Sequence, residues 1–155
     1  MQSALLFYCK VPDNIKNIRK EYDKHINLPA HITLGYLKAD YDEDKLIKKL
    51  KKFKKIKLEL NKLYSMSDLI AFSVNNKNIN IIAKSIREYI EKYPKSGFHM
   101  SLAYKRDKKI NKKVYKKIEK NINIPTEIII NKIWIMKRNK SIGKDWYRSK
   151  TIFLK

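Results

Sequence analysis

The chain has 155 residues, of which 43% are hydrophobic; this suffices for one compact core and excludes disorder throughout. Lysine and arginine number 37 against 15 acidic residues, which gives a formal net charge of +22. A field of this sign concentrates nucleic acid, nucleotides or acidic lipid. The lysines are spread along amphipathic segments and also fit an A/T-rich coding genome, so charge alone does not identify a partner.

The single cysteine, Cys9, excludes an intramolecular disulfide, and no Cys/His cluster has the spacing of a zinc site. We therefore expect a cytoplasmic protein, in the host cytoplasm if it is viral, with no metal or other cofactor. The N-terminal "MQSALLFYCKV" lacks the basic start of a signal peptide. No stretch approaches the roughly twenty apolar residues that span a bilayer, so no membrane partner is expected.

The first half of the chain predicts strand, helix, strand, helix. The segment 3–9 has the composition of a strand, and 13–26 places apolar residues on one helical stripe, with Asp13 as its N-cap. A second strand is expected at 30–37 and a second, lysine-rich helix at 42–55.

The second half repeats this order after two further strands. Strict alternation predicts a strand at 56–63, and a Ser-rich turn joins it to another at 69–74. The remaining predicted elements are a helix at 79–93, a strand at 97–104, a helix at 111–122, and closing strands at 127–136 and 150–154. No Gly-rich or Pro-rich linker separates the halves, so we expect one domain over 1–155.

The two halves share a short motif, "HITLGY" at 31–36 and "HMSLAY" at 99–104. Each has a histidine, a hydroxyl residue two positions on, a leucine, a small residue and a tyrosine. Because side chains alternate along a strand, the period predicts that histidine, hydroxyl and small residue share one face. These residues are His31, Thr33 and Gly35 in the first motif and His99, Ser101 and Ala103 in the second.

The same period fixes the expected place of the motif's other residues. Gly35 and Ala103 would leave room for a ligand on the motif face, whereas Tyr36 and Tyr104 would point to the opposite side and join the core. The remaining histidine, His25, lies at a helix end without the motif and is expected at the surface or as a helix cap.

Paired imidazoles and hydroxyls are suited to phosphoester cleavage. One imidazole acts as general base on water or a ribose hydroxyl, and the other as general acid on the departing oxygen. The hydroxyls donate hydrogen bonds to the non-bridging oxygens, and no metal is required. The alternative is a structural duplication with two hydrogen-bonded core histidines.

These motifs resemble those of the two-histidine phosphoesterase superfamily, which includes RNA 2',5'-ligases, cyclic phosphodiesterases and small viral oligonucleotide phosphodiesterases. The likeness extends to "LLFYCKVP", "LPAHITLGYL" and "IIINKIWIMKR…WYRSKTIFL". It implies an α+β fold of two pseudo-symmetric lobes with antiparallel sheets that flank a central cleft. It also implies catalytic roles for four residues: His31 and His99 as the acid/base pair, and Thr33 and Ser101 as hydrogen-bond donors that orient the phosphate.

Three further residues are candidates for substrate binding. Tyr8 in the first strand could stack on a base or bond a phosphate. Lys105, which follows the second motif, could meet a phosphate; its alternative is a solvated lysine. Trp146 lies in the predicted loop 143–149 between basic residues, a composition suited to base stacking; its alternative is cover for the sheet edge. Trp134 and Phe72 are expected in the core.

Three functions remain open at this point. The first is hydrolysis of a nucleotide second messenger, such as 2',3'-cyclic GMP-AMP or another cyclic dinucleotide, or 2',5'-oligoadenylate, with a role in viral immune evasion. The second is opening of 2',3'-cyclic phosphates at RNA ends, with the positive surface holding the RNA. The third is a nucleic-acid-binding module without catalysis. The expected partner is thus a nucleotide, an oligonucleotide or RNA, and the default state is a monomer.

Overall fold

The computed structural model describes residues 1–23, 28–66, 69–104, 112–139 and 145–155. Its helices are α1 (Asp13–Tyr22), α2 (Glu43–Leu50), α3 (Lys77–Ser85) and α4 (Lys112–Asn121), with a 3-10 turn at Arg87–Tyr89. Its strands are β1 (Gln2–Tyr8), β2 (His31–Leu37), β3 (Ile56–Leu60), β4 (Leu63–Met66), β5 (Leu69–Ser73), β6 (Ile90–Lys92), β7 (His99–Tyr104), β8 (Thr126–Ile130), β9 (Lys132–Arg138) and β10 (Tyr147–Phe153). The expected α+β class is confirmed.

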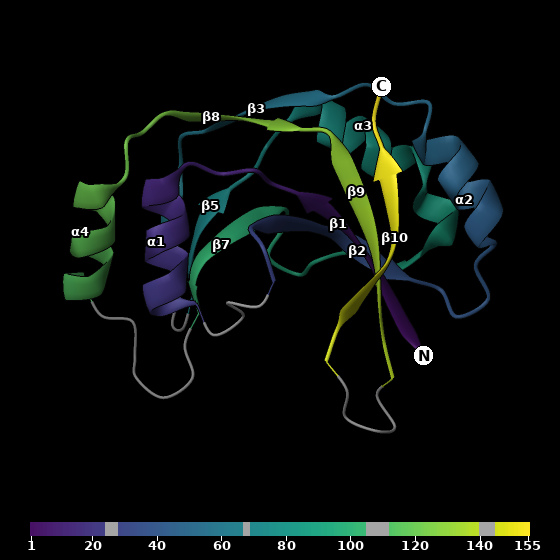
Figure 1. The fold of residues 1–155 in the computed structure, drawn as a ribbon, viewed down its shortest axis with the longest axis horizontal. Coiled ribbons are helices and arrows are strands. Elements are labelled where there is room, and N and C mark those ends of the chain that lie inside the picture. The colour runs from purple at the N-terminus through teal and green to yellow at the C-terminus, as the bar shows by residue number, and fades with distance from the viewer. Residues whose placement is uncertain (24–27, 67–68, 105–111, 140–144) are drawn as a thin grey trace.

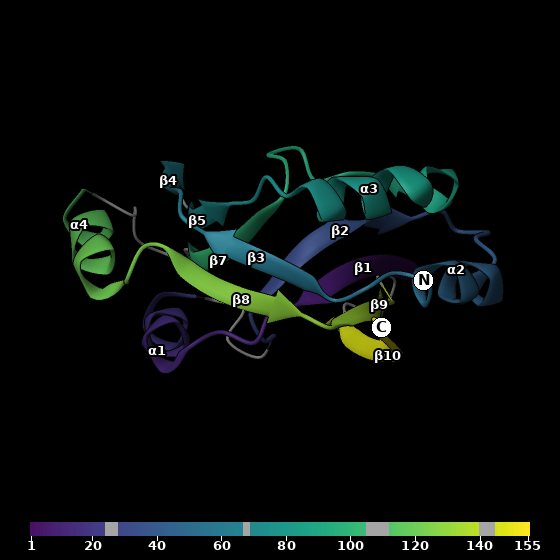
Figure 2. The ribbon, with the colours of Figure 1, turned by 90° about the horizontal axis from the view of Figure 1, so that it is seen from above.

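The strands form one large sheet in the order β10-β9-β1-β2-β7-β5-β4, with β6 also paired to β2, and a small sheet of β3 and β8. Every named strand pair is antiparallel. The sheets of the two halves join where β2 meets β7, at the pair Ile32 and Met100. Helices α1 and α4 lie at one end of the molecule and α2 and α3 at the other (Figures 1 and 2).

Each face of the large sheet carries its own hydrophobic cluster. The main core joins one face to all four helices and to the β3–β8 pair, through residues that include Phe7, Ile15, Leu46, Leu58, Phe72, Ile79 and Ile118. The smaller cluster contains Leu6, Trp134 and Met136, with Tyr8, Leu28 and Trp146 packed against it. Phe72 is therefore core, as predicted. Trp134 is also buried, but in the smaller cluster.

A β-bulge in β2 changes the alternation of the first motif. Leu6 of β1 pairs with Thr33, but the next residue back, Leu5, pairs with Gly35, so Leu34 is the extra residue. Leu34 and Gly35 consequently both face the main core, and Tyr36 returns to the face that carries Thr33.

The second motif has the same bulge at the equivalent position. In the pairing of β5 with β7, Ala71 lies opposite Ser101 and Ile70 opposite Ala103, so Leu102 is the extra residue. Ala103 is fully buried in the main core. The prediction that the small residues line the motif face and the tyrosines the core is therefore wrong, because one inserted residue reverses the parity of everything after it.

Long-range pairing also moves several element boundaries. The predicted strand 56–63 is divided between β3, which pairs with β8, and β4, which pairs with β5. The predicted helix 79–93 ends at Ser85, because Ile90–Lys92 forms a strand against β2. The segment 127–136 is likewise divided at Asn131 between the two sheets.

The start of the first helix differs in a smaller way. Pro12 occupies the N-cap position without a side-chain hydrogen bond, and Asp13 is the first helical residue. At that place its carboxylate still interacts favourably with the helix dipole, although it does not cap the helix.

Gly35 is expected to be needed for packing. A Cβ at this position would lie 3.1 Å from both Cδ1 and Cγ2 of Ile90 and 3.3 Å from the carbonyl oxygen of Lys92. We predict that Gly35→Ala lowers the free energy of unfolding by about 1–3 kcal/mol in urea titrations, as overpacking does. The double variant Gly35→Ala/Ile90→Val should cost less than the sum of the single changes, because Cδ1 is removed. A Gly35→Ala variant as stable as the parent would contradict this.

Candidate active site

The junction of β2 and β7 brings the two motifs together. Because Ile32 lies opposite Met100 in an antiparallel pair, one step along each strand places His31 beside Ser101 and Thr33 beside His99. Such neighbours have Cβ atoms about 4.5–5.5 Å apart. Ile32 and Met100 are fully buried, whereas the four motif side chains are partly exposed on the opposite face. Each histidine thus lies beside the hydroxyl residue of the other motif.

Both imidazoles are held in the same way. Nδ1 of His31 is 2.8 Å from the carbonyl oxygen of Pro29, and Nδ1 of His99 is 3.0 Å from that of Gly97. A carbonyl oxygen only accepts, so Nδ1 carries a proton and donates in each case. In the neutral ring, Nε2 is therefore the nitrogen without a proton in both histidines.

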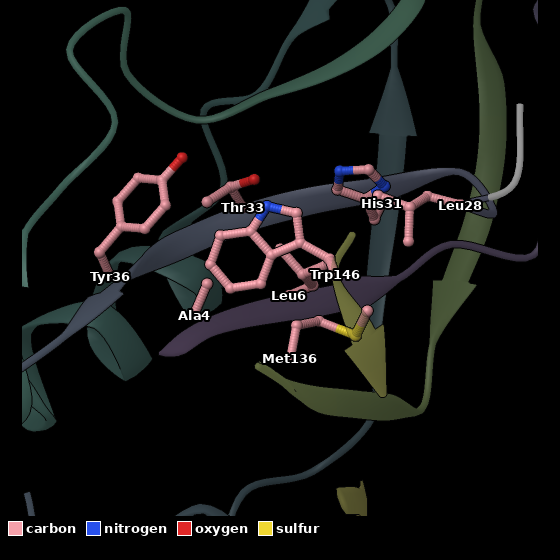
Figure 3. Close-up of a pocket in the computed structure, with 8 residues that line it drawn as sticks. All are labelled: Ala4, Leu6, Leu28, His31, Thr33, Tyr36, Met136 and Trp146. Carbon is pink, nitrogen blue, oxygen red and sulfur yellow. The ribbon is translucent and has the colours of Figure 1, made fainter. Parts of the chain in front are cut away.

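A pocket of about 150 Å³ opens beside the first motif. Figure 3 shows the His31 ring and the Thr33 hydroxyl on the same side of β2, with Trp146 and Tyr36 among the lining residues. The Tyr36 and Trp146 rings lie 6.3 Å apart with an interplanar angle of 43°. The Arg138 guanidinium is 4.7 Å from the centre of the Trp146 ring. The pocket therefore combines a motif histidine with two aromatic rings, one of which is in contact with Arg138.

The last residue of β1, Tyr8, lies between the first motif and β9. Tyr8 lies opposite His31 on one side and Lys132 on the other. Its ring stacks on Trp134, with centroids 4.8 Å apart, and Lys132 Nζ lies 5.6 Å from the Tyr8 centroid. Arg148 covers the Trp134 ring at 4.9 Å. Tyr8 is thus adjacent to the motif histidine, in an aromatic and basic setting.

The remaining predicted residues divide into those the structure describes and those it does not. Trp146 lines the pocket, directly before β10. Lys105 and His25 lie outside the described residues. Strict alternation placed Tyr36 in the core and so missed it as a lining residue of the pocket. The signal for a bulge was the repeated pattern "LGY" and "LAY", in which two core-facing residues precede a tyrosine.

The structure also bears on three other features: a thiol nucleophile, a metal site and a membrane-spanning helix. Burial raises the pKa of the Cys9 thiol to about 12, so this cysteine does not supply a thiolate nucleophile at neutral pH. In the part of the chain that the structure describes, no three His, Cys, Asp or Glu side chains gather as metal ligands would. None of the helices there is long and apolar enough to cross a membrane.

The shared tether predicts the tautomer of both rings. In long-range ¹H–¹⁵N spectra recorded at a pH where the rings are neutral, His31 and His99 should each show a protonated Nδ1 and an unprotonated Nε2. Substitution of either ring by alanine assigns the signals. A neutral ring with its proton on Nε2 would contradict the arrangement.

Comparison with known proteins gives the fold. Neither a protein-family model nor a curated protein sequence matches the chain. Among solved structures, E. coli LigT complexed with ATP has a TM-score of 0.60 at 14% identity, and its complex with NADP+ has 0.62 at 13%; each match covers 99% of both chains. The Thermus thermophilus protein TT0787 matches with a TM-score of 0.62 at 12% identity over 99% of this chain and 97% of that protein. The chain therefore has the fold of LigT and TT0787, in agreement with the α+β fold that the resemblance implied.

Proposed function

We propose that this protein is a metal-independent phosphodiesterase that cleaves nucleotide phosphodiesters by two-histidine acid/base catalysis. The observation that carries the proposal is the symmetry of the site. Two histidines on adjacent strands have identical backbone tethers, and each lies beside the hydroxyl residue of the other motif. A pair of hydrogen-bonded core histidines would not need this repeated, solvent-facing arrangement.

The proposed mechanism uses the four motif side chains. Nε2 of one neutral imidazole takes the proton from the attacking water or ribose hydroxyl, while Nε2 of the other, protonated imidazole gives its proton to the departing oxygen. The bond from the nucleophile to phosphorus forms as the bond to the leaving oxygen breaks. Thr33 and Ser101 donate hydrogen bonds to the non-bridging oxygens, where negative charge develops.

The lining of the pocket supports a nucleotide as substrate. Tyr36 and Trp146 offer ring faces for a base, and Arg138 offers positive charge. Tyr8 extends this surface past His31, and Lys105 is proposed to meet a phosphate. The E. coli LigT structures with ATP, NADP+ and 3'-AMP show nucleotides bound to a protein of the same fold.

Within this class we favour an oligonucleotide second messenger, either a cyclic dinucleotide such as 2',3'-cyclic GMP-AMP or 2',5'-oligoadenylate. The basis is the resemblance to small viral phosphodiesterases, from which we also infer a cytoplasmic role in immune evasion. The second candidate is the opening of 2',3'-cyclic phosphates at RNA ends, which the net charge of +22 favours.

Turnover should depend on both histidines and not on metal. In excess EDTA, the protein is offered 2',3'-cyclic GMP-AMP, 3',5'-linked cyclic dinucleotides, 2',5'-oligoadenylate and RNA with a 2',3'-cyclic phosphate. We expect cleavage of one class, with kcat lowered about 10²–10⁴-fold by His31→Ala and by His99→Ala. Salt separates the candidates, because binding of the longer RNA weakens more steeply with ionic strength. Absence of turnover on every substrate, with RNA binding retained in both variants, would indicate the binding module instead.

Trp146 should contribute to binding more than to chemistry. Loss of base stacking on an aromatic ring costs about 1–3 kcal/mol per base, so Trp146→Ala should raise KM roughly 5- to 150-fold with a smaller effect on kcat. Trp146→Phe, which keeps a ring, is the matched control and should retain most of the affinity. Equal loss in both variants, or none in either, would exclude stacking on this residue.

A further inference from the structure

A second pocket lies where β1 ends and the chain leads into β2, next to α1. It has a volume of about 350 Å³. Its lining combines Lys16, Arg19 and Lys20 from α1 with Tyr8 at the end of β1 and the segment 28–30 that leads into β2. Three basic side chains from one helix therefore face a hollow next to the motif strand.

The two pockets are adjacent and share a lining residue near His31. Leu28 lines both of them. Tyr8, which lines the second pocket, is the strand partner of His31, and the carbonyl oxygen of Pro29, also in that lining, holds the His31 ring. The second pocket is therefore next to the residues that position the His31 ring.

The charges of this pocket favour an anion. Arg19 is 8% exposed; its Nη2 lies 2.9 Å from Asp23 Oδ2 and donates to the Leu28 carbonyl oxygen at 3.0 Å. Its Nε is buried without a hydrogen-bond partner among the described residues. Lys16 and Lys20 are exposed, and Lys16 lies 4.0 Å from the exposed carboxylate of Asp13. No acidic residue of the described chain lines the pocket, so the two lysines give it a net positive charge.

We infer that this pocket is a second substrate subsite, which takes the phosphate adjacent to the one that is cleaved. The inference rests on the proposed function and narrows it, because a substrate that fills both pockets carries at least two linked phosphates. The base next to the scissile bond occupies the Tyr36–Trp146 pocket, the scissile phosphate lies at the histidines, and the neighbouring phosphate meets Lys16 and Lys20. Mononucleotide substrates fill only the first pocket.

The test compares ligands that differ by one linked phosphate. Binding of ApA and ApApA, each with 2',5' and with 3',5' linkages, is measured by calorimetry on the full-length His99→Ala protein, which removes turnover. Lys16→Gln/Lys20→Gln is added to this background. The matched control is Lys48→Gln/Lys51→Gln, which removes the same charge from the exposed face and end of α2.

We expect ApApA of at least one linkage to bind more tightly than ApA in the parent. Lys16→Gln/Lys20→Gln should weaken ApApA about tenfold and ApA less than about threefold, because two charge-assisted phosphate contacts are lost. The control should change neither ligand by more than about threefold, since only long-range attraction is reduced.

Two results would overturn the inference. One is equal weakening of ApA and ApApA by the Lys16/Lys20 substitutions, and the other is ApApA binding no tighter than ApA, or not at all, for both linkages. Either can occur while the native enzyme still cleaves a phosphodiester, so this failure is distinct from failure of the proposed function. That function is tested separately by turnover of the native protein and its loss in His31→Ala.

Discussion

The contact between β2 and β7 is the constraint on which the rest of the molecule depends. Ile32 and Met100 are fully buried where the sheets of the two halves join, and burial of such side chains contributes about 1.5–3 kcal/mol each. Since adjacent residues of a strand point to opposite faces, fixing these two in the core presents the neighbouring histidines and hydroxyls on the other face. Packing of the core and assembly of the site are therefore one event.

The paired bulges show how the duplicated motif uses its small residues. Leu34 and Gly35 in one half, and Leu102 and Ala103 in the other, supply two consecutive core-facing positions. Gly35 is small because the Ile90 side chain occupies the adjacent space. The bulge then returns Tyr36 to the motif face, where its ring can serve the pocket. Small residues thus give tight packing behind the sheet and, indirectly, an aromatic surface in front of it.

The positively charged side chains lie in three different surroundings, and their effects differ accordingly. Most lysines among the described residues are exposed, and salt screens charges in such positions. Near the site, cations instead lie against aromatic rings, with Arg138 over Trp146 and Arg148 over Trp134. The buried pair of Arg19 and Asp23 has another role, because Arg19 also donates to the Leu28 carbonyl oxygen and so connects α1 to the segment that leads into β2. Removal of either partner would leave an uncompensated buried charge.

The sequence by itself determined the strand and helix alternation, the α+β class and the two motifs, because periodicity and internal repetition are local properties. It also offered Tyr8 and Trp146 as candidates for substrate binding, Trp146 from the composition of its loop. Three features came from the tertiary structure alone: Ile90–Lys92 is a strand, 127–136 is divided between two sheets, and Tyr36 faces the site. These features depend on which strands pair and where a residue is inserted; pairing partners are distant in the chain, so no local pattern specifies them.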